Sequence, residues 1–209
     1  MTTTAPSPAT YPARLNIDYV GAGRDRLTTL IRPIMLIPIL LIFWGFGNTL
    51  STLISFPVLL MLLFRQKYPR WWFDYNLEYQ RYSTRFMSYA SLLSDDYPST
   101  DDQQGVRLEI DYPDAKALNR WMPLVKWILA IPHYIVLMVI GSIAIVLVLI
   151  GWFIVLFTGS FPKMFHDFIV ASNRWALRVT AYMLILTTDE YPPFSFDADE
   201  EPALPEAPS

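Results

Sequence analysis

The sequence repeats itself at a nearly constant spacing, and each copy is built around a long apolar stretch. Residues 14–19 (RLNIDY) return as residues 107–112 (RLEIDY), 93 positions later. The offset stays at 93 or 94 along the chain, so the order of elements is duplicated with the residues, which predicts two similar structural units. Further matches pair Ile37-Pro38 with Ile131-Pro132, Pro69 with Pro162, Asp74 with Asp167, Arg81 with Arg174, Arg85 with Arg178, Tyr89 with Tyr182, and Tyr97-Pro98 with Tyr191-Pro192.

The apolar stretches lack ionisable side chains over lengths that match a bilayer. Between Arg32 and Arg65 there are 32 residues without an acidic or basic side chain, and between Lys126 and Lys163 there are 36, with His133 the one imidazole. A spanning helix needs about 20 apolar residues, and a central charge costs about 2.5–3.5 kcal/mol. Each stretch is too long for one ordinary span, which predicts a transmembrane helical hairpin in each copy.

We expect these hairpins to be helical because lipid offers no partner to an open backbone. The first stretch is expected to divide at residues 45–48 and the second near Gly141-Ser142 or a few residues later. Prolines early in the first helix of each hairpin are expected to kink it; they are Pro33, Pro38, Pro123 and Pro132. The four predicted spans lie near residues 29–46, 48–65, 121–140 and 143–161.

A short strand is predicted ahead of each hairpin. Residues 13–19 alternate apolar and polar side chains with a period of two, and residues 106–112 repeat the pattern. Isolated strands are unstable, so we expect these two to pair with each other or with the extended Tyr-Pro segments.

An amphipathic helix is predicted after each hairpin, near residues 70–93 and 163–187. Aromatic side chains recur there at steps of three and four, which places them on one helical face. Such a helix is expected to lie in the membrane interface. Two alternatives stay open: the aromatic face packs as protein core, or the more apolar second helix makes a further crossing.

Four arginines, duplicated between the copies, are candidate binders of lipid headgroups because guanidinium groups match phosphate oxygens. They fall just beside the aromatic faces, and an aspartate precedes each pair. The alternative is that these arginines form structural ion pairs with the aspartates. The arginines are Arg81, Arg85, Arg174 and Arg178, and the aspartates are Asp74 and Asp167.

The net charge of the whole chain is −3, but the part of the chain outside its acidic segments is basic. Nine of the 19 acids lie in the polar stretch 94–105 and in the tail, which leaves ten acids against 16 bases elsewhere. This distribution favours contact with anionic lipid over nucleic acid. Residues 1–10, the linker 99–105 and the acidic tail 195–209 are expected to be disordered. Lys and Arg avoid the expected hairpin tips, which predicts that both termini lie in the cytoplasm.

Few residues carry catalytic chemistry. His133 is an intramembrane polar residue and hence a functional candidate, although an imidazole bonded to a carbonyl freed by proline is equally natural. The chain has no cysteine, and neither copy has the His/Glu spacing of a zinc or di-iron site. We therefore expect no metal, no cofactor and no enzymatic activity; phosphate-binding and Ser-His-Asp motifs are also lacking.

The second copy contains a series of phrases that resembles a bacterial membrane-protein family, known as domain of unknown function 4389. These phrases include AIPHY at 130–134, LFTGSFPK at 156–163, FHDF at 165–168 and LTTDEYPPF at 186–194. The resemblance covers residues 11 to 196 and implies a small multi-pass protein without an assigned activity. The first copy departs from the pattern, with Ile39 in place of the histidine.

The sequence thus predicts an all-α integral membrane protein of four spans, with repeat 1 at 11–98 and repeat 2 at 106–194. We expect a non-enzymatic, lipid-contacting accessory or scaffold protein of the bacterial cytoplasmic membrane. Partners would be anionic lipids and a protein bound in the membrane or through the acidic tail. The alternative is a small transporter or channel component that acts as an oligomer, because parallel repeats occur in transporters.

Overall fold

The computed structural model describes residues 11–42, 48–100 and 104–196. The expected disordered N-terminus lies outside these residues, and so do residues 45–47 of the predicted break, 101–103 of the linker and 197–209 of the acidic tail. Over these residues the chain is mostly helical, with one small sheet. In chain order the elements are β1 (Ala13–Ile17), α1 (Arg26–Ile42), α2 (Asn48–Arg65), α3 (Arg70–Ala90), β2 (Val106–Ile110), α4 (Met122–Leu129), α5 (Ile131–Thr158), α6 (Lys163–Thr180) and the π-helix η2 (Ala181–Ile185).

The two predicted strands are confirmed, and they pair with each other. β1 and β2 run antiparallel, with Leu15 opposite Leu108 at the centre of the register. Both strands alternate buried and half-buried residues, as the period of two predicts. Leu15 and Leu108 are also equivalent residues of the repeat, 93 positions apart. A pseudo-two-fold axis therefore passes between them, perpendicular to the sheet.

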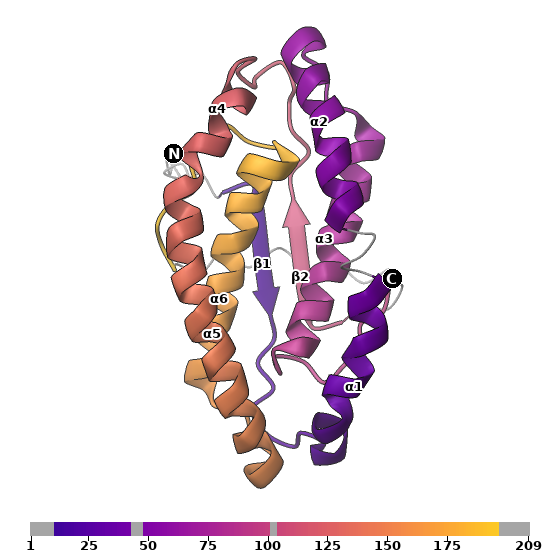
Figure 1. Cartoon of the computed structure of the whole chain (residues 1–209), viewed down its shortest axis with the longest axis vertical. Helices are drawn as coiled ribbons and strands as arrows, with labels where there is room; N and C mark the ends of the chain where they lie inside the picture. Colours follow the sequence, from indigo (N-terminus) through magenta and orange to yellow (C-terminus); the bar gives the residue numbers. More distant parts are fainter. Residues whose placement is uncertain (1–10, 43–47, 101–103, 197–209) are drawn as a thin grey trace, which may run out of the picture.

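Each strand packs against the amphipathic helix of the other copy. β1 lies along α6, and β2 lies along α3 (Figure 1). Equivalent arginines bond the strands in place: Arg174 Nε donates to Leu15 O at 2.8 Å, and Arg81 Nε donates to Leu108 O at 3.2 Å. Because the strands are exchanged, the two copies share one hydrophobic core.

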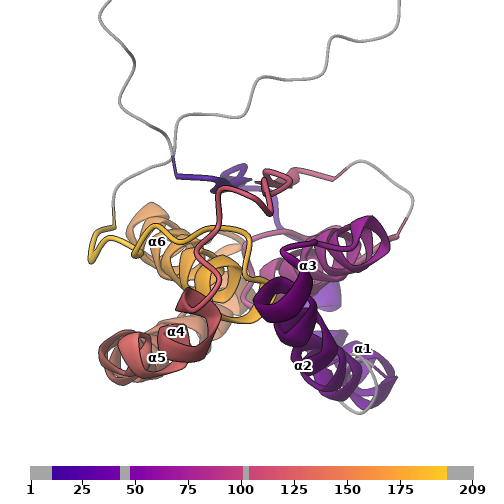
Figure 2. The same ribbon diagram turned by 90° about the horizontal axis from the view of Figure 1, so that it is seen from above.

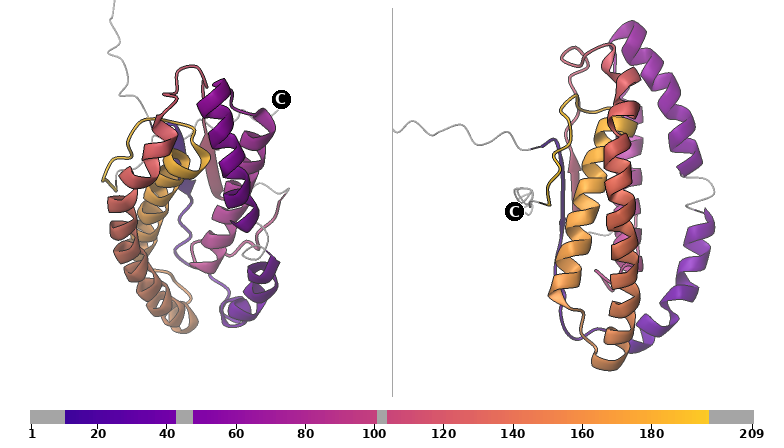
Figure 3. Two further views of the ribbon diagram at one scale, coloured as in Figure 1. Left: turned by 45° about the horizontal axis from the view of Figure 1, so that its top comes forward. Right: turned by 60° about the vertical axis from the view of Figure 1, so that its left-hand side comes forward.

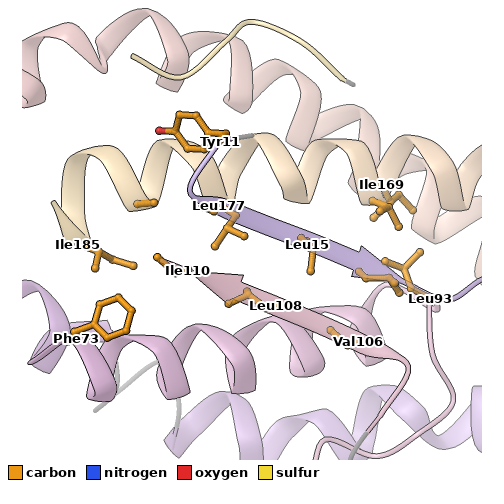
Figure 4. Packing of buried hydrophobic residues seen from close by; sticks show 14 of the residues in the cluster. Tyr11, Leu15, Phe73, Leu93, Val106, Leu108, Ile110, Ile169, Leu177 and Ile185 are labelled. Carbon is orange, nitrogen blue, oxygen red and sulfur yellow. The ribbon is translucent and has the colours of Figure 1, made fainter. Parts of the chain in front are cut away.

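This shared core lies between the strands and the helices α3 and α6. Figure 4 shows Leu15 of β1 beside Leu177 of α6, and Leu108 of β2 above α3, which contributes Phe73. Much of the aromatic face that runs along α3 and along α6 into η2 is buried in the protein, including Tyr89, Trp175 and Tyr182. The interpretation of these faces as protein core is thus the one that the structure supports.

The predicted hairpins are wrong. We call α1 with α2 the first arm and α4 with α5 the second arm. Figure 3 shows α1 and α2 following one another in the same direction, and α4 continuing almost directly into α5. α5 runs without interruption through Gly141-Ser142, so the expected spans at 121–140 and 143–161 do not exist.

Backbone chemistry explains where the second arm breaks. The break between α4 and α5 falls at Ala130, next to Pro132 in the first turn of α5. Proline has no N–H to donate to the preceding turn, so a helix boundary is favoured there. A glycine inside a helix costs only about 1 kcal/mol relative to alanine, which is not enough to end a long apolar helix at Gly141.

The elements form three layers, seen from above in Figure 2. The strand pair lies on one side, α3 and α6 form the middle, and the two arms form the opposite side. The arms run in opposite directions, as the pseudo-two-fold axis requires (Figure 1). Among the helices that the structure describes, α5 alone is both long and apolar enough to cross a membrane, so the expected four spans are reduced to one such helix.

Candidate membrane-contact site

The arms present a broad apolar surface away from the rest of the protein. We call it the apolar arm face. Soluble monomers rarely expose contiguous apolar patches larger than a few hundred Å², so a surface of this kind marks a contact site. Its large exposed side chains come from all four arm helices: Leu27, Leu30, Ile34, Ile37, Leu41, Phe56, Leu60, Phe64, Leu124, Trp127, Ile128, Ile131, Ile135, Met138, Val139, Ile143, Val146, Leu149, Phe153 and Phe157.

Exposed basic side chains lie at both ends of each arm. Arg26 begins α1 and Arg65 ends α2, while Arg120 precedes α4 and Lys163 follows α5. The sequence prediction put all bases on one side of two hairpins. Because the arms do not fold back, the bases instead flank both ends of the molecule.

A buried cation fastens the first arm to the segment after α3. The Arg32 side chain is 2% exposed, and its Nη2 lies 2.6 Å from Asp95 Oδ1. Its Nη1 donates to Tyr89 O at 2.7 Å, and the guanidinium lies 4.3 Å from the centre of the Tyr89 ring. Arg24 also pairs with Asp95 Oδ1, at 2.9 Å. Asp95, which composition assigns to the acidic linker region, is therefore a structural residue.

The second copy repeats this arrangement with a different cation. Lys126 Nζ lies 2.7 Å from Asp189 Oδ1, donates to Thr188 O at 2.6 Å, and sits 5.0 Å from the centre of the Tyr182 ring. We call each set a cation–aspartate–tyrosine clamp: Arg32, Asp95 and Tyr89 in one copy, Lys126, Asp189 and Tyr182 in the other.

Sequence reasoning missed the clamps. The offset of 94 carries Arg32 onto Lys126 and Asp95 onto Asp189, and the offset of 93 carries Tyr89 onto Tyr182. Charge conserved at matched repeat positions was the signal that could have found them.

The candidate headgroup arginines have protein partners in the described structure. Arg81 and Arg174 bond the strands, as given above. Arg85 Nη1 donates to Ser99 O at 2.7 Å. Arg178 is buried, and its Nη1 donates to Ser195 O at 3.4 Å. Each pair lies along one helix, and the structure does not gather all four at one site. Their binding of lipid headgroups stays a prediction.

The two aspartates form ion pairs with cations one helical turn earlier. Asp74 lies 3.3 Å from Arg70 Nε, and Asp167 lies 2.7 Å from Lys163 Nζ. The hydrogen bond from Lys163 lowers the pKa of the Asp167 carboxyl below its ordinary value. Both pairs are largely exposed to solvent, so each contributes about 0–1 kcal/mol.

His133 is fully buried between α5, α6 and the segment 191–196. Trp175 Nε1 donates to His133 Nδ1 at 3.1 Å, and the imidazole stacks on Phe194 with 4.0 Å between ring centres. Nδ1 therefore accepts, so a neutral ring carries its proton on Nε2. The expected bond to a freed carbonyl is replaced by this bond to an indole.

His166 is buried in the first turn of α6. Its ring packs edge-on against Tyr19 at 5.0 Å, and its Nδ1 lies 3.3 Å from Asp167 Oδ1. Burial lowers the pKa of His166 below its ordinary value. Within the described ranges, no three His, Asp or Glu side chains lie close enough together to hold a metal ion.

The fold is thus a duplicated one, in which two copies share one hydrophobic core. The family described as Domain of unknown function (DUF4389) matches residues 26–100 and again residues 120–195. The chain belongs to this family and carries two tandem copies of its domain. No curated protein and no solved structure matches the chain.

Proposed function

We propose that this protein is a non-enzymatic, lipid-contacting accessory or scaffold protein of the bacterial cytoplasmic membrane. The apolar arm face is the observation that carries the proposal. Its side chains come from the four arm helices, which lie on one side of the molecule (Figure 2). All of them except Leu27, Leu30 and Leu124 fall in the two stretches that lack acidic and basic side chains. Hydrocarbon is the environment in which such a surface is stable without a protein partner.

The polar groups of α5 also favour contact with lipid over a pore lining. Ser142 Oγ donates to Met138 O at 2.8 Å, and Thr158 Oγ1 donates to Ile154 O at 2.7 Å. Both hydroxyls are thus satisfied within their own helix, as hydroxyls of lipid-facing helices are. A transporter or channel would instead need polar side chains that line the pathway of its substrate or ion.

Anionic lipids are the proposed partners. The exposed bases at the arm ends lie where headgroup phosphates would meet the edge of the apolar arm face. Each base near an anionic leaflet contributes about 1 kcal/mol, and salt weakens this attraction. We place both termini in the cytoplasm, where the acidic tail would be available to a protein partner.

Membrane association can be tested with a matched pair of methionines. Met138 lies in α5 and is 71% exposed, whereas Met164 lies at the start of α6, outside the arms, and is 74% exposed. Met138→Glu should weaken flotation with vesicles of phosphatidylcholine and 30% phosphatidylglycerol by on the order of 50-fold, since a charge at hydrocarbon depth costs about 2.5 kcal/mol. Met164→Glu should have a much smaller effect.

The same assay defines what would contradict the proposal. Wild-type protein should remain in the membrane fraction after alkaline washing of cells. Equal flotation of the two glutamate variants, or release of the wild type by the wash, would contradict lipid contact through the arms.

The predicted headgroup role of the four duplicated arginines needs a separate comparison. One variant changes Arg81, Arg85, Arg174 and Arg178 to Gln. The other changes the exposed arm-end bases Arg26, Arg65, Arg120 and Lys163 to Gln. If the duplicated arginines bind headgroups, the folded first variant loses its preference for phosphatidylglycerol. Loss of that preference only in the second variant would assign headgroup binding to the arm ends.

A further inference from the structure

We propose that the two arms lie flat in a single leaflet, parallel to the membrane plane, with the pseudo-two-fold axis along the membrane normal. This inference rests on the proposed function, because it specifies how the apolar arm face meets lipid. The strand pair then lies farthest from the bilayer, and α3 with α6 covers the arms at the headgroup level. The protein would contact one leaflet without crossing to the other side.

The distribution of charge across the layers supports this orientation. The strands carry ion pairs on the side of the molecule opposite the arms: Arg14 Nη2 lies 2.9 Å from Asp111, and Arg107 Nη2 lies 3.3 Å from Asp18. The pseudo-two-fold axis passes through the strand pair, so the strands lie at the middle of the long axis (Figure 1). If the long axis crossed the bilayer, these exposed charges would lie near its centre, where ionised side chains are rare.

The bases at the arm ends support the same orientation. Crossing arms would place Arg26 and Lys163 on one side of the membrane and Arg65 and Arg120 on the other. Loops rich in Lys and Arg remain in the cytoplasm, so a spanning molecule would oppose this rule at one end. Flat arms place the bases of both ends at the same headgroup surface.

The dimensions of the arms also fit one leaflet. A helix with its side chains is about 10–12 Å thick, whereas one leaflet offers about 15 Å of hydrocarbon, half of about 30 Å. A single layer of arm helices therefore fits within it. By contrast, the 28 residues of α5 extend about 42 Å, longer than the hydrocarbon is thick, and α4 lengthens the arm further.

Spin labels along α5 test the inference directly. The chain has no cysteine, so single-cysteine variants can be labelled without removing native thiols. Ile135, Val146 and Phe157 are exposed and stand 11 residues apart, close to three full turns, so their side chains share one face of α5. Label depth would be measured in vesicles of phosphatidylcholine with 30% phosphatidylglycerol, from the relative accessibility to oxygen and to a nickel complex.

Flat arms predict that the labels at Ile135→Cys, Val146→Cys and Phe157→Cys lie at the same depth within a few Å. A spanning α5 predicts a deep label at Val146→Cys and shallow labels at the other two, and this result would overturn the inference. It would leave the proposed function intact, because the protein would still contact lipid. Failure of all variants and of the wild type to bind vesicles would contradict the proposed function itself.

A sidedness measurement gives an independent result. Lys116 lies in the segment that leads from β2 to α4, and Met164 lies in the first turn of α6, which follows α5. The start of α4 and the end of α5 lie at opposite ends of the long axis (Figure 1). Lys116→Cys and Met164→Cys, bound to sealed vesicles, should both react fully with a membrane-impermeant maleimide added outside. Protection of one cysteine until the vesicles are opened would show that the long axis crosses the bilayer.

Discussion

Arg32 and Lys126 lie at equivalent positions of the two copies, 94 residues apart, and each is a buried cation paired with the matching aspartate of its own copy. Each also lies against a tyrosine ring, Tyr89 or Tyr182. The pairing joins an arm to the segment that follows α3 or η2, so the two clamps fix the apolar arm face relative to the shared core. Charge within the arms thus serves architecture, while the outward surface stays apolar.

Removal of a clamp cation should destabilise the fold strongly. Arg32→Met leaves Asp95 without one of its two arginines and Tyr89 O without a donor, which should lower the free energy of unfolding by about 2–3 kcal/mol. The matched control is Arg70→Met, because the Arg70 side chain is 69% exposed and should contribute less than about 1 kcal/mol. Urea unfolding in mild detergent measures both, and equal losses would contradict a structural role for the clamp.

Two glycines of α5 should respond oppositely to alanine. A Cβ added at Gly151 would collide with the ring of Phe161, whereas one added at Gly141 would meet open space. Gly151→Ala should therefore lower stability by about 1–3 kcal/mol through overpacking. Gly141→Ala should raise it by about 0.5–1 kcal/mol, because alanine favours the helix. Thermal unfolding would show shifts of the melting temperature of opposite sign. A gain in stability for Gly151→Ala would contradict the close contact between α5 and Phe161.

Acidic pH should destabilise the protein through His166. Burial lowers the pKa of its imidazole, an effect partly opposed by Asp167 and reinforced by Lys163 and Arg24. The unfolded chain then binds the proton at a higher pH than the folded chain, so stability falls as the pH drops through about 6.5, the ordinary value.

The first copy supplies the natural control for this prediction. Phe73 occupies the position equivalent to His166 and packs on Tyr112 at 5.1 Å, much as His166 packs on Tyr19. His166→Phe should therefore fold, and its stability should change less than that of the wild type between pH 7.5 and pH 5.5. Identical pH profiles for the two proteins would contradict the assignment of this loss to His166.

The acidic tail and the aromatic segment before it should differ in their effect on stability. Truncation after Phe196 removes five acids and little apolar surface, so the melting temperature should stay unchanged. Truncation after Glu190 also removes Phe194, which stacks on His133, and Tyr191, whose hydroxyl donates to Leu129 O. That truncation should cost about 2–4 kcal/mol. A large loss of stability on truncation after Phe196 would show that the acidic tail itself packs on the folded protein.

Local patterns along the chain predicted the local structure well. Period-two alternation identified both strands, and periods of three and four identified α3 and α6. The repeat offset predicted an internal symmetry, and the structure shows it in the pairing of Leu15 with Leu108.

The sequence patterns did not predict how the strands and helices pack against one another. Nothing in the spacing shows that β1 packs on α6 of the other copy, because the exchange depends on contacts such as Arg174 to Leu15, 159 residues apart. The prediction of two transmembrane hairpins was wrong for a different reason. Their lengths were inferred from the bilayer, whereas Pro132 and the apolar residues around Gly141 determine where the helices actually end.

Photo-crosslinking measures the contact between the arms and lipid most directly. A benzophenone amino acid placed at Phe157, which is 78% exposed on α5, and another at Arg107 on β2 would be irradiated in intact membranes. Mass spectrometry of the purified protein should show phospholipid adducts at position 157 and none at position 107. Crosslinks to protein, without lipid adducts, at position 157 would contradict contact between the arms and lipid.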